Sequence, residues 1–446
     1  MTNSKTVYVV HSIDTEGPLY ESLQATFDRL ADLFNVHLPA TYANLTKLQN
    51  QEINLNGKES QVAEVVNPQL LAYNDSWEKI DSMLAEIMTA DFRNKLPDAA
   101  GNGWIYNWHC LDHVEFKTNP RKRDMGYHNI HDRYLEFIDK YNSPMDAVEW
   151  HFHPMSTYQE AHRCATSYVN SPHLYETLAR RIIERKFFPS VFRAGFQTER
   201  PDSNWFLEQW IPFDTSNMAI EDPLEFEKQN DFKNGRSGDW RRAPNDWSVY
   251  QPDIYDYQRP GNCHRYIARS LNINTRIACI NQREVDRAFE KASKGEPVLM
   301  GIASHDWRQM KPEVDKIREL LETSSKNFPD TQFIYARSKD AFNAVVHNGK
   351  TEEIALQVNL YVEDGVHRLK VETVEGSVFG PQPFLAIKTR GGRFIHDNFD
   401  FGLNGKTWHY AFDYDTVPPE DLDTIGVAAN NQFGSTCVKT LKFGDS

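Results

Sequence analysis

The sequence lacks the features that would mark a membrane protein or a disulfide-stabilised one. It has no run of about 18 consecutive apolar residues, so we expect no membrane span. The first residues, MTNSKTVYVVHSIDTEG, contain no basic segment followed by an apolar one, and we therefore expect no signal peptide. The five cysteines are scattered, odd in number and without C-x-x-C spacing, which argues against a disulfide framework and favours reduced thiols in a cytoplasmic protein.

Positive charge is also scarce, because 63 acidic residues outnumber 49 basic ones and leave a net charge of −14. An acidic surface repels nucleic acid and anionic lipid, so nucleic acid is not an expected partner. We find no internal repeat and no low-complexity tract. With 446 residues, the chain is too long for one ordinary core, and we expect two or three domains.

Short apolar runs alternate with amphipathic stretches over residues 5–346. The runs lie at 6–11, 103–108, 147–151, 190–193, 211–214, 298–303 and 332–336. The amphipathic stretches lie at 19–33, 76–88, 133–141, 172–185, 283–294 and 312–323. Strand–helix alternation of this kind predicts an α/β fold with a parallel sheet, either open or closed into a barrel.

Two regions depart from this alternation. Residues 218–262 are rich in Asn, Asp, Pro and Gly with interspersed aromatics, which predicts an insertion with a functional role. Residues 352–446 show apolar–polar alternation broken by turns, which predicts a C-terminal antiparallel β-sandwich. We therefore expect one domain over 1–348 and a second over 349–446. For the second domain, glycan binding, covering of the first domain and formation of a homo-oligomer all remain open.

Ionisable side chains follow five of the predicted strands at their carboxyl ends, where parallel α/β domains hold their reactive residues. These residues are Asp14 and Glu16, His151 and His153, Arg193, Asp214, and His305. Each has an ordinary structural explanation, such as a turn at Asp14, a salt bridge at Arg193, or helix capping by Asp306 beside His305. Their shared position at one edge of the sheet nevertheless favours a functional site.

The spacing of His151 and His153 indicates a metal site. Residues two apart in an extended chain point to the same side, so both imidazoles can reach one ion. A carboxylate from Glu16 or Asp14 would complete a two-histidine, one-carboxylate set with positions open for water. We expect a divalent metal, Zn²⁺ foremost, with Co²⁺, Ni²⁺ and Fe²⁺ as alternatives. A pair of hydrogen-bonded histidines without metal is the competing interpretation.

Other candidates lie outside the strand ends. Trp240, Trp247 and Tyr250 belong to the insertion, and their rings suit stacking on a sugar substrate, although packing of a loop onto the core explains them almost as well. The run Arg121-Lys122-Arg123 suits a phosphate or a carboxylate, although charged runs are usually solvated loops. A histidine placed like His305 suits a general acid.

Five motifs give the chain a resemblance to a known family. SIDTEGP, EWHFHP, FRAG, FDTSN and SHD, in this order, resemble the motifs of the NodB-homology polysaccharide deacetylases (carbohydrate esterase family 4), in a divergent branch with H-x-H-P and F-R-A-G. The similarity covers residues 5–345. It implies a distorted seven-stranded (β/α) barrel and a metal-dependent hydrolase that removes an acyl group, N-acetyl foremost, from a sugar or related amide.

The resemblance also implies a role for each matching residue. Asp14 matches the catalytic base, Arg193 the residue that pairs with this base, and His305 the general acid. Asp214 matches the acid of the fourth motif. Glu16 matches the metal-binding carboxylate. Without a signal peptide, a nucleotide-linked or lipid-linked sugar fits better as the substrate than a wall polymer does.

The second motif departs from the family pattern. Its histidines are usually four apart, whereas here they are two apart, Met155 stands at the usual second position, and His162 is a further candidate ligand. A non-catalytic glycan-binding protein on a deacetylase-like barrel is therefore an alternative function. A wide separation of Asp14 and His305 would favour it. Non-haem iron oxygenases also use two histidines and a carboxylate, but their usual antiparallel cores do not match the alternation here.

Overall fold

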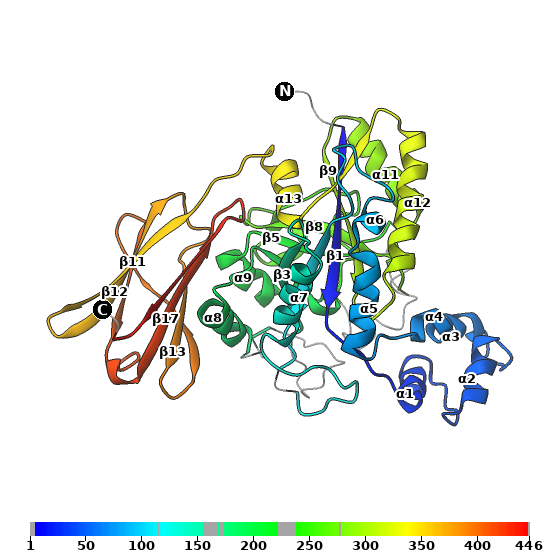
Figure 1. Cartoon of the computed structure of the whole chain (residues 1–446), viewed down its shortest axis with the longest axis horizontal. Coiled ribbons are helices and arrows are strands. Elements are labelled where there is room, and N and C mark those ends of the chain that lie inside the picture. The colour runs from blue at the N-terminus through cyan, green and yellow to red at the C-terminus, as the bar shows by residue number, and fades with distance from the viewer. Residues whose placement is uncertain are drawn as a thin grey trace.

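A computed structural model of the chain describes residues 5–114, 116–154, 168–169, 171, 173–221, 238–275 and 278–444. No helix in these ranges has both the length and the apolar content needed to cross a bilayer. The architecture is a parallel barrel surrounded by helices, followed by a sandwich of antiparallel sheets (Figure 1).

The barrel is closed by seven parallel strands, which confirms the predicted fold class. In order they are β1 (Thr6–Thr15), β2 (Tyr106–Leu111), β3 (Ala147–Phe152), β4 (Val191–Ala194), β5 (Phe213–Asn217), β8 (Tyr266–Asn272) and β9 (Val298–His305). Pairing of β1 with β9 closes the ring. The surrounding helices include α5 (Trp77–Ile87), α7 (Asn129–Lys140), α8 (His173–Arg185), α9 (Pro201–Trp210), α11 (Gln282–Ser293) and α12 (Lys311–Asn327).

One of the seven predicted runs is not a barrel strand. β10 (Gln332–Tyr335) pairs only with the first half of β1, while β2 pairs with the second half along the same edge. The seventh barrel strand is β8, which the sequence pattern did not single out. It follows a small hairpin of β6 (Pro252–Asp253) and β7 (Asp256–Pro260).

The N-terminal end of the barrel is plugged by α13 (Ser338–Val346). Phe342 of this helix stacks on Phe213 of β5 with ring centroids 4.5 Å apart, and both belong to one buried cluster with Val10 and Val191. Apolar side chains fill this end of the barrel. The ionisable side chains predicted from the strand ends lie at the opposite end, where the strands terminate.

The connection from β1 to β2 is a long segment that is mainly helical. It contains α1 (Leu23–Phe34), α2 (Tyr42–Gln49), α3 (Glu59–Val65), α4 (Pro68–Leu71), α5 and α6 (Ala90–Arg93). The first four helices share a small apolar cluster of their own and extend away from the barrel beyond the end of β1 (Figure 1). The amphipathic stretch at 76–88 corresponds to α5, which begins after Ser76, whose hydroxyl accepts from the N–H of Lys79.

The C-terminal region consists of two four-stranded antiparallel sheets, so the predicted β-sandwich is confirmed. One sheet contains β11 (Ala355–Glu363), β12 (Val366–Glu375), β16 (Thr407–Phe412) and β15 (Asp400–Phe401). The other contains β14 (Phe394–Asp397), β13 (Phe384–Thr389), β17 (Leu422–Asn430) and β18 (Thr436–Lys442). Phe384 and Ala428 of the second sheet share a buried cluster with α8 and α9, so the sandwich packs directly on the barrel helices.

Candidate metal centre and catalytic groups

The carboxyl ends of β1, β3, β4 and β9 bring six of the predicted side chains together. Asp14 of β1 and His305 of β9 are register partners, and His305 Nε2 lies 3.6 Å from Asp14 Oδ2. His153, which follows β3, places its Nε2 3.6 Å from Glu16 Oε1. Arg193 of β4 donates from Nε to Asp14 Oδ1. The gathering of side chains predicted from the strand ends is thus present for β1, β3, β4 and β9.

Glu16, His151 and His153 form a group that can hold a metal ion, because their ligand atoms all lie within 4.8 Å of one another. The backbone carbonyl of Arg193 lies 2.9 Å from His151 Nδ1. Since a carbonyl only accepts, Nδ1 carries the proton and His151 Nε2 presents a lone pair. That atom faces His153 Nε2 at 3.1 Å. Two imidazole nitrogens and a carboxylate oxygen directed at one point fit a divalent cation.

Glu16, rather than Asp14, is the carboxylate of this group. Its second oxygen, Oε2, accepts from Arg123 Nη2 at 2.5 Å, which leaves Oε1 facing His153. Burial alone would raise the pKa of Glu16, but Arg123 and then His153 outweigh it, so the pKa is lowered and the group is ionised. Two residues of the basic run meet carboxylates: Arg121 pairs with Glu21, and Arg123 pairs with Glu16, where its side chain is buried.

Asp306 fixes the turn that carries Glu16. Its carboxylate accepts from the N–H groups of Glu16 and Gly17 at 3.0 and 2.8 Å, and from the hydroxyl of Tyr134 at 3.0 Å. Burial raises the pKa of Asp306 to about 7, although the two backbone hydrogen bonds act in the opposite direction. Helix capping, the structural explanation considered above for Asp306, is therefore wrong, because its oxygens are engaged by the turn and by Tyr134.

Asp14 is held as a carboxylate by its neighbours. Burial would raise its pKa, but Arg193, His151 and His305 outweigh this and bring the pKa to about 2. Arg193 is fully buried and is also anchored by its Nη1, which donates to the carbonyl of Thr215 at 2.7 Å. Burial lowers the pKa of His305 to about 4, against the effect of Asp14 and Glu16. An ionised base and a neutral imidazole therefore stand side by side at neutral pH.

The F-R-A-G motif has a local explanation in the packing of His153. A Cβ on Gly195 would lie 2.0 Å from His153 Cδ2, so the imidazole rests directly on the glycine. Phe196, in the left-handed region at φ 53°, places its ring 4.8 Å from that of His153. A phenylalanine in this strained conformation beside a candidate metal ligand is the kind of backbone feature that functional sites retain.

We expect Gly195→Ala to weaken metal binding about 10- to 100-fold, the cost typical of disturbing the support of a ligand. The added methyl group displaces His153, because the clash is with its ring and its Cα. The dissociation constant of the metal, measured by competition with a chelator, tests this. Gly391→Ala is the matched control, since its added methyl group meets nothing nearer than 3.8 Å. Equal affinity in both variants would show that His153 is not a ligand.

Asp214 does not join this cluster. Phe213 points into the barrel, so the next residue along the strand points outward. Asp214 Oδ2 pairs with Arg265 Nη1 at 2.9 Å, and Arg265 also pairs with Glu199 at 2.9 Å. Among the described residues, Asp214 contacts neither Arg193 nor His305. Asp214 therefore belongs to a buried ionic network outside the barrel and not to the cluster in which it was predicted to act.

The predicted substrate-stacking residues are buried as well. Trp240, Trp247 and Tyr250 are 0%, 1% and 6% exposed. Their polar atoms donate to the backbone carbonyls of Gln197 at 2.7 Å, Glu284 at 2.9 Å and Tyr257 at 2.7 Å. Packing onto the core, the alternative given above, accounts for them, and Trp240 supports the loop that holds Phe196. His162 and Met155 lie outside the described residues.

Comparison with models of known protein families found none that matches the chain, and a search of curated proteins found no match. The resemblance to the NodB-homology deacetylases therefore stays a prediction from the sequence motifs.

Proposed function

We propose that this chain is a metal-dependent hydrolase that removes an acyl group, N-acetyl foremost, from a sugar or a related amide. One observation carries the proposal: an ionised Asp14 lies 3.6 Å from His305 in the same buried cluster as the Glu16–His151–His153 group. Metal-assisted hydrolysis uses a carboxylate base, a histidine and a set of metal ligands close together, and this cluster contains candidates for each.

The proposed metal is Zn²⁺, with Co²⁺, Ni²⁺ and Fe²⁺ as alternatives, held by His151, His153 and Glu16. When bound, the cation acidifies water and polarises the acyl oxygen. Asp14 accepts the proton of the attacking water, and Arg193 keeps Asp14 ionised until that step. His305 Nε2 lies 3.6 Å from Asp14 Oδ2, so the proton passes from Asp14 to this imidazole, and from there to the leaving nitrogen or oxygen.

The two alternative functions have less support. A non-catalytic glycan-binding barrel would be favoured by a wide separation of Asp14 and His305, but these side chains are close. The iron oxygenase alternative explains only the three candidate metal ligands, which are the two histidines and the carboxylate. It gives no role to the Asp14–Arg193 pair, and the closed parallel barrel differs from the antiparallel core it would need.

The proposal predicts acetate release from N-acetylated sugars. We expect the zinc-loaded protein to liberate acetate from N-acetylglucosamine oligomers or from nucleotide-linked N-acetylglucosamine. Chelation should stop the release, and Zn²⁺ or Co²⁺ should restore it. Enzymatic quantification of acetate provides the measurement. Turnover that survives complete removal of metal would contradict the proposed mechanism, and absence of turnover across both substrate types would contradict the proposed substrate class.

A further inference from the structure

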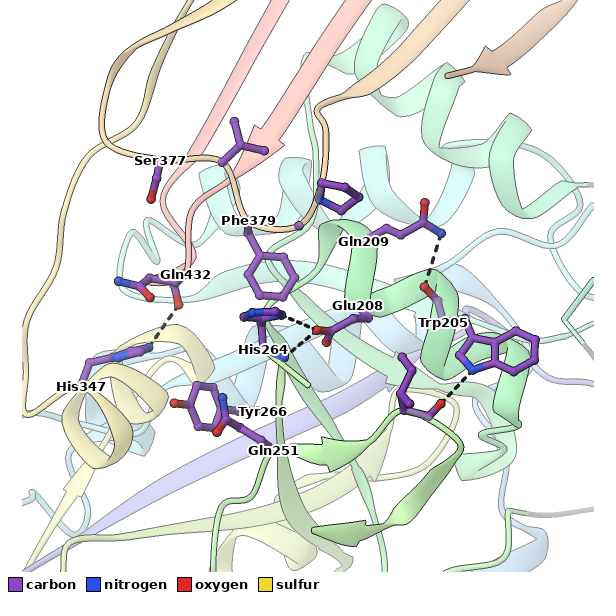
Figure 2. A pocket seen from close by; sticks show the side chains of 14 residues that line it. Trp205, Glu208, Gln209, Gln251, His264, Tyr266, His347, Ser377, Phe379 and Gln432 are labelled. Carbon is purple, nitrogen blue, oxygen red and sulfur yellow. Dashed lines mark hydrogen bonds and ion pairs between the residues drawn. The ribbon is translucent and has the colours of Figure 1, made fainter. Parts of the chain in front are cut away.

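A cavity of about 670 Å³ lies between the barrel helices and the sandwich (Figure 2). We call it the flank pocket. One wall is formed by α9 and the start of β8, and the other by the loop 377–381 that precedes β13. His347, which follows the helix that plugs the N-terminal end of the barrel, also lines it. The flank pocket is therefore remote from Asp14 and the metal ligands, and its size suits a small-molecule site.

The two walls are fixed against each other. Asn430 Nδ2 donates to the carbonyls of Pro189 at 2.7 Å and Trp210 at 2.9 Å, linking the sandwich to the barrel. Gly380 has φ +77° and lies so close to α9 that a Cβ would be 2.0 Å from the carbonyl oxygen of Gln209. Since only glycine fits there without strain, the loop is locked onto the helix. A preformed pocket loses little free energy to ordering when a ligand binds.

The charges around the flank pocket disfavour an anionic ligand. None of the described residues that line it is Lys or Arg. Its carboxylate, Glu208, already accepts from His264 N at 2.6 Å, from His264 Nδ1 at 2.7 Å and from Arg265 N at 3.1 Å. Among the described lining residues, no lysine or arginine is therefore available to pair with a phosphate or a carboxylate, and burying such a group would be costly.

The remaining lining combines ring faces with hydrogen-bonding side chains. Trp205 is 46% exposed, and because its Nε1 donates to the Ile254 carbonyl at 2.8 Å, its ring face is what it offers a ligand. Tyr266 and three glutamine side chains also line the pocket (Figure 2): Gln209, Gln251 and Gln432. The Nδ1–H of His264 is used by Glu208, so Nε2 presents a lone pair to a donor.

From this lining we propose that the flank pocket binds a neutral oligosaccharide. The apolar faces of sugar rings pack on aromatic side chains, and sugar hydroxyls donate to and accept from amides and an imidazole. Gln209 Nε2 already donates to the Trp205 carbonyl, but a purely apolar ligand would offer no partner to the amides of Gln251 and Gln432. The proposal does not depend on catalysis at the barrel mouth. It gives the sandwich the glycan-binding role that the sequence left open, with its loop 377–381 forming one wall of the pocket.

Isothermal titration calorimetry on the full chain, stripped of metal with EDTA so that no hydrolysis occurs, tests the proposal. The probes are chitotetraose and cellotetraose, with anionic tetragalacturonate for comparison. We expect saturable binding of a neutral tetrasaccharide and about tenfold weaker binding in Trp205→Ala, the size of one lost stacking contact. The double variant Gln251→Ala with Gln432→Ala should also bind more weakly. Tyr414→Ala, an aromatic that is 82% exposed elsewhere on the sandwich, should bind like wild type.

Three results would overturn the proposal: no binding of either neutral probe at millimolar concentration, equal affinity in wild type and both pocket variants, or preferred binding of tetragalacturonate. Unchanged melting temperatures in the variants exclude unfolding as the cause of lost binding. Because the titration involves no turnover, failure of the proposed hydrolase would leave its result unaffected.

Discussion

Replacing Asp14 by asparagine is expected to lower kcat for acyl hydrolysis by about 10³-fold, within the range that a general base contributes. Asparagine keeps the shape of the side chain and can still accept from Arg193, but it cannot take a proton. Since Asp14 is not among the metal-holding group, metal content should stay at the wild-type level. Acetate release and mass-spectrometric metal analysis on the same sample measure both quantities.

The matched control is Asp400→Asn, an exposed carboxylate on the sandwich that should leave turnover unchanged. Arg193 is fully buried and loses its counter-charge in Asp14→Asn, so a thermal melt is needed to show that the variant is folded. Full activity in folded, metal-loaded Asp14→Asn would show that another group is the base.

Removal of both imidazoles is expected to abolish metal binding. His151→Ala with His153→Ala leaves Glu16 as the single ligand of the group, so affinity should fall by more than about 100-fold, the upper cost of changes outside the ligand set. Metal content should drop from about one ion per chain to near zero. The control is His37→Ala with His264→Ala, because both of these histidines are exposed.

Two outcomes would contradict this prediction in different ways. Equal metal content in the variant and in wild type would place the ion elsewhere in the protein. Near-zero metal in both proteins, even after incubation with Zn²⁺, would remove the hydrolase proposal while leaving the barrel and the flank pocket as described.

The sequence predicted those parts of the structure that depend on local patterning. Strand–helix alternation was enough for a parallel α/β sheet, whereas its closure into a barrel was implied only by the motif resemblance. Apolar–polar alternation was enough for the sandwich. The two-residue spacing of His151 and His153 correctly placed both imidazoles on one side, because alternation along an extended chain is a local property. Position at a strand end was also sufficient to associate Asp14 with His305.

What the sequence missed depends on tertiary pairing. β8 contains Arg269 and Asn272 within its span and follows an irregular insertion, so it does not resemble a buried strand. β10 has the pattern of a barrel strand, but β2 already occupies half of the same edge of β1. Arg123 sits in a basic run of ordinary appearance, and only the fold brings it to Glu16, 107 positions away along the chain.

Asp214 shows a different limit of inference from motifs. Its position at a strand end matched the pattern, but a strand end presents side chains to both faces, and the outward face of β5 holds Arg265 and Glu199. Burial of Trp240 and Trp247 likewise could not be distinguished from ligand stacking by composition, since both uses favour large aromatic side chains.

Asp14 at the end of β1 and Glu16 in the turn that follows are two residues apart, yet each has an arginine of its own: Arg193 from β4 for the first and Arg123 from the segment after β2 for the second. Separate counter-ions make the two acids non-equivalent before any ligand arrives. A single shared arginine would let the two carboxylates compete for one proton and one ion. With two, the scaffold separates the acid that we propose transfers a proton from the acid that we propose binds the ion, so that either environment can change in evolution while the other stays the same.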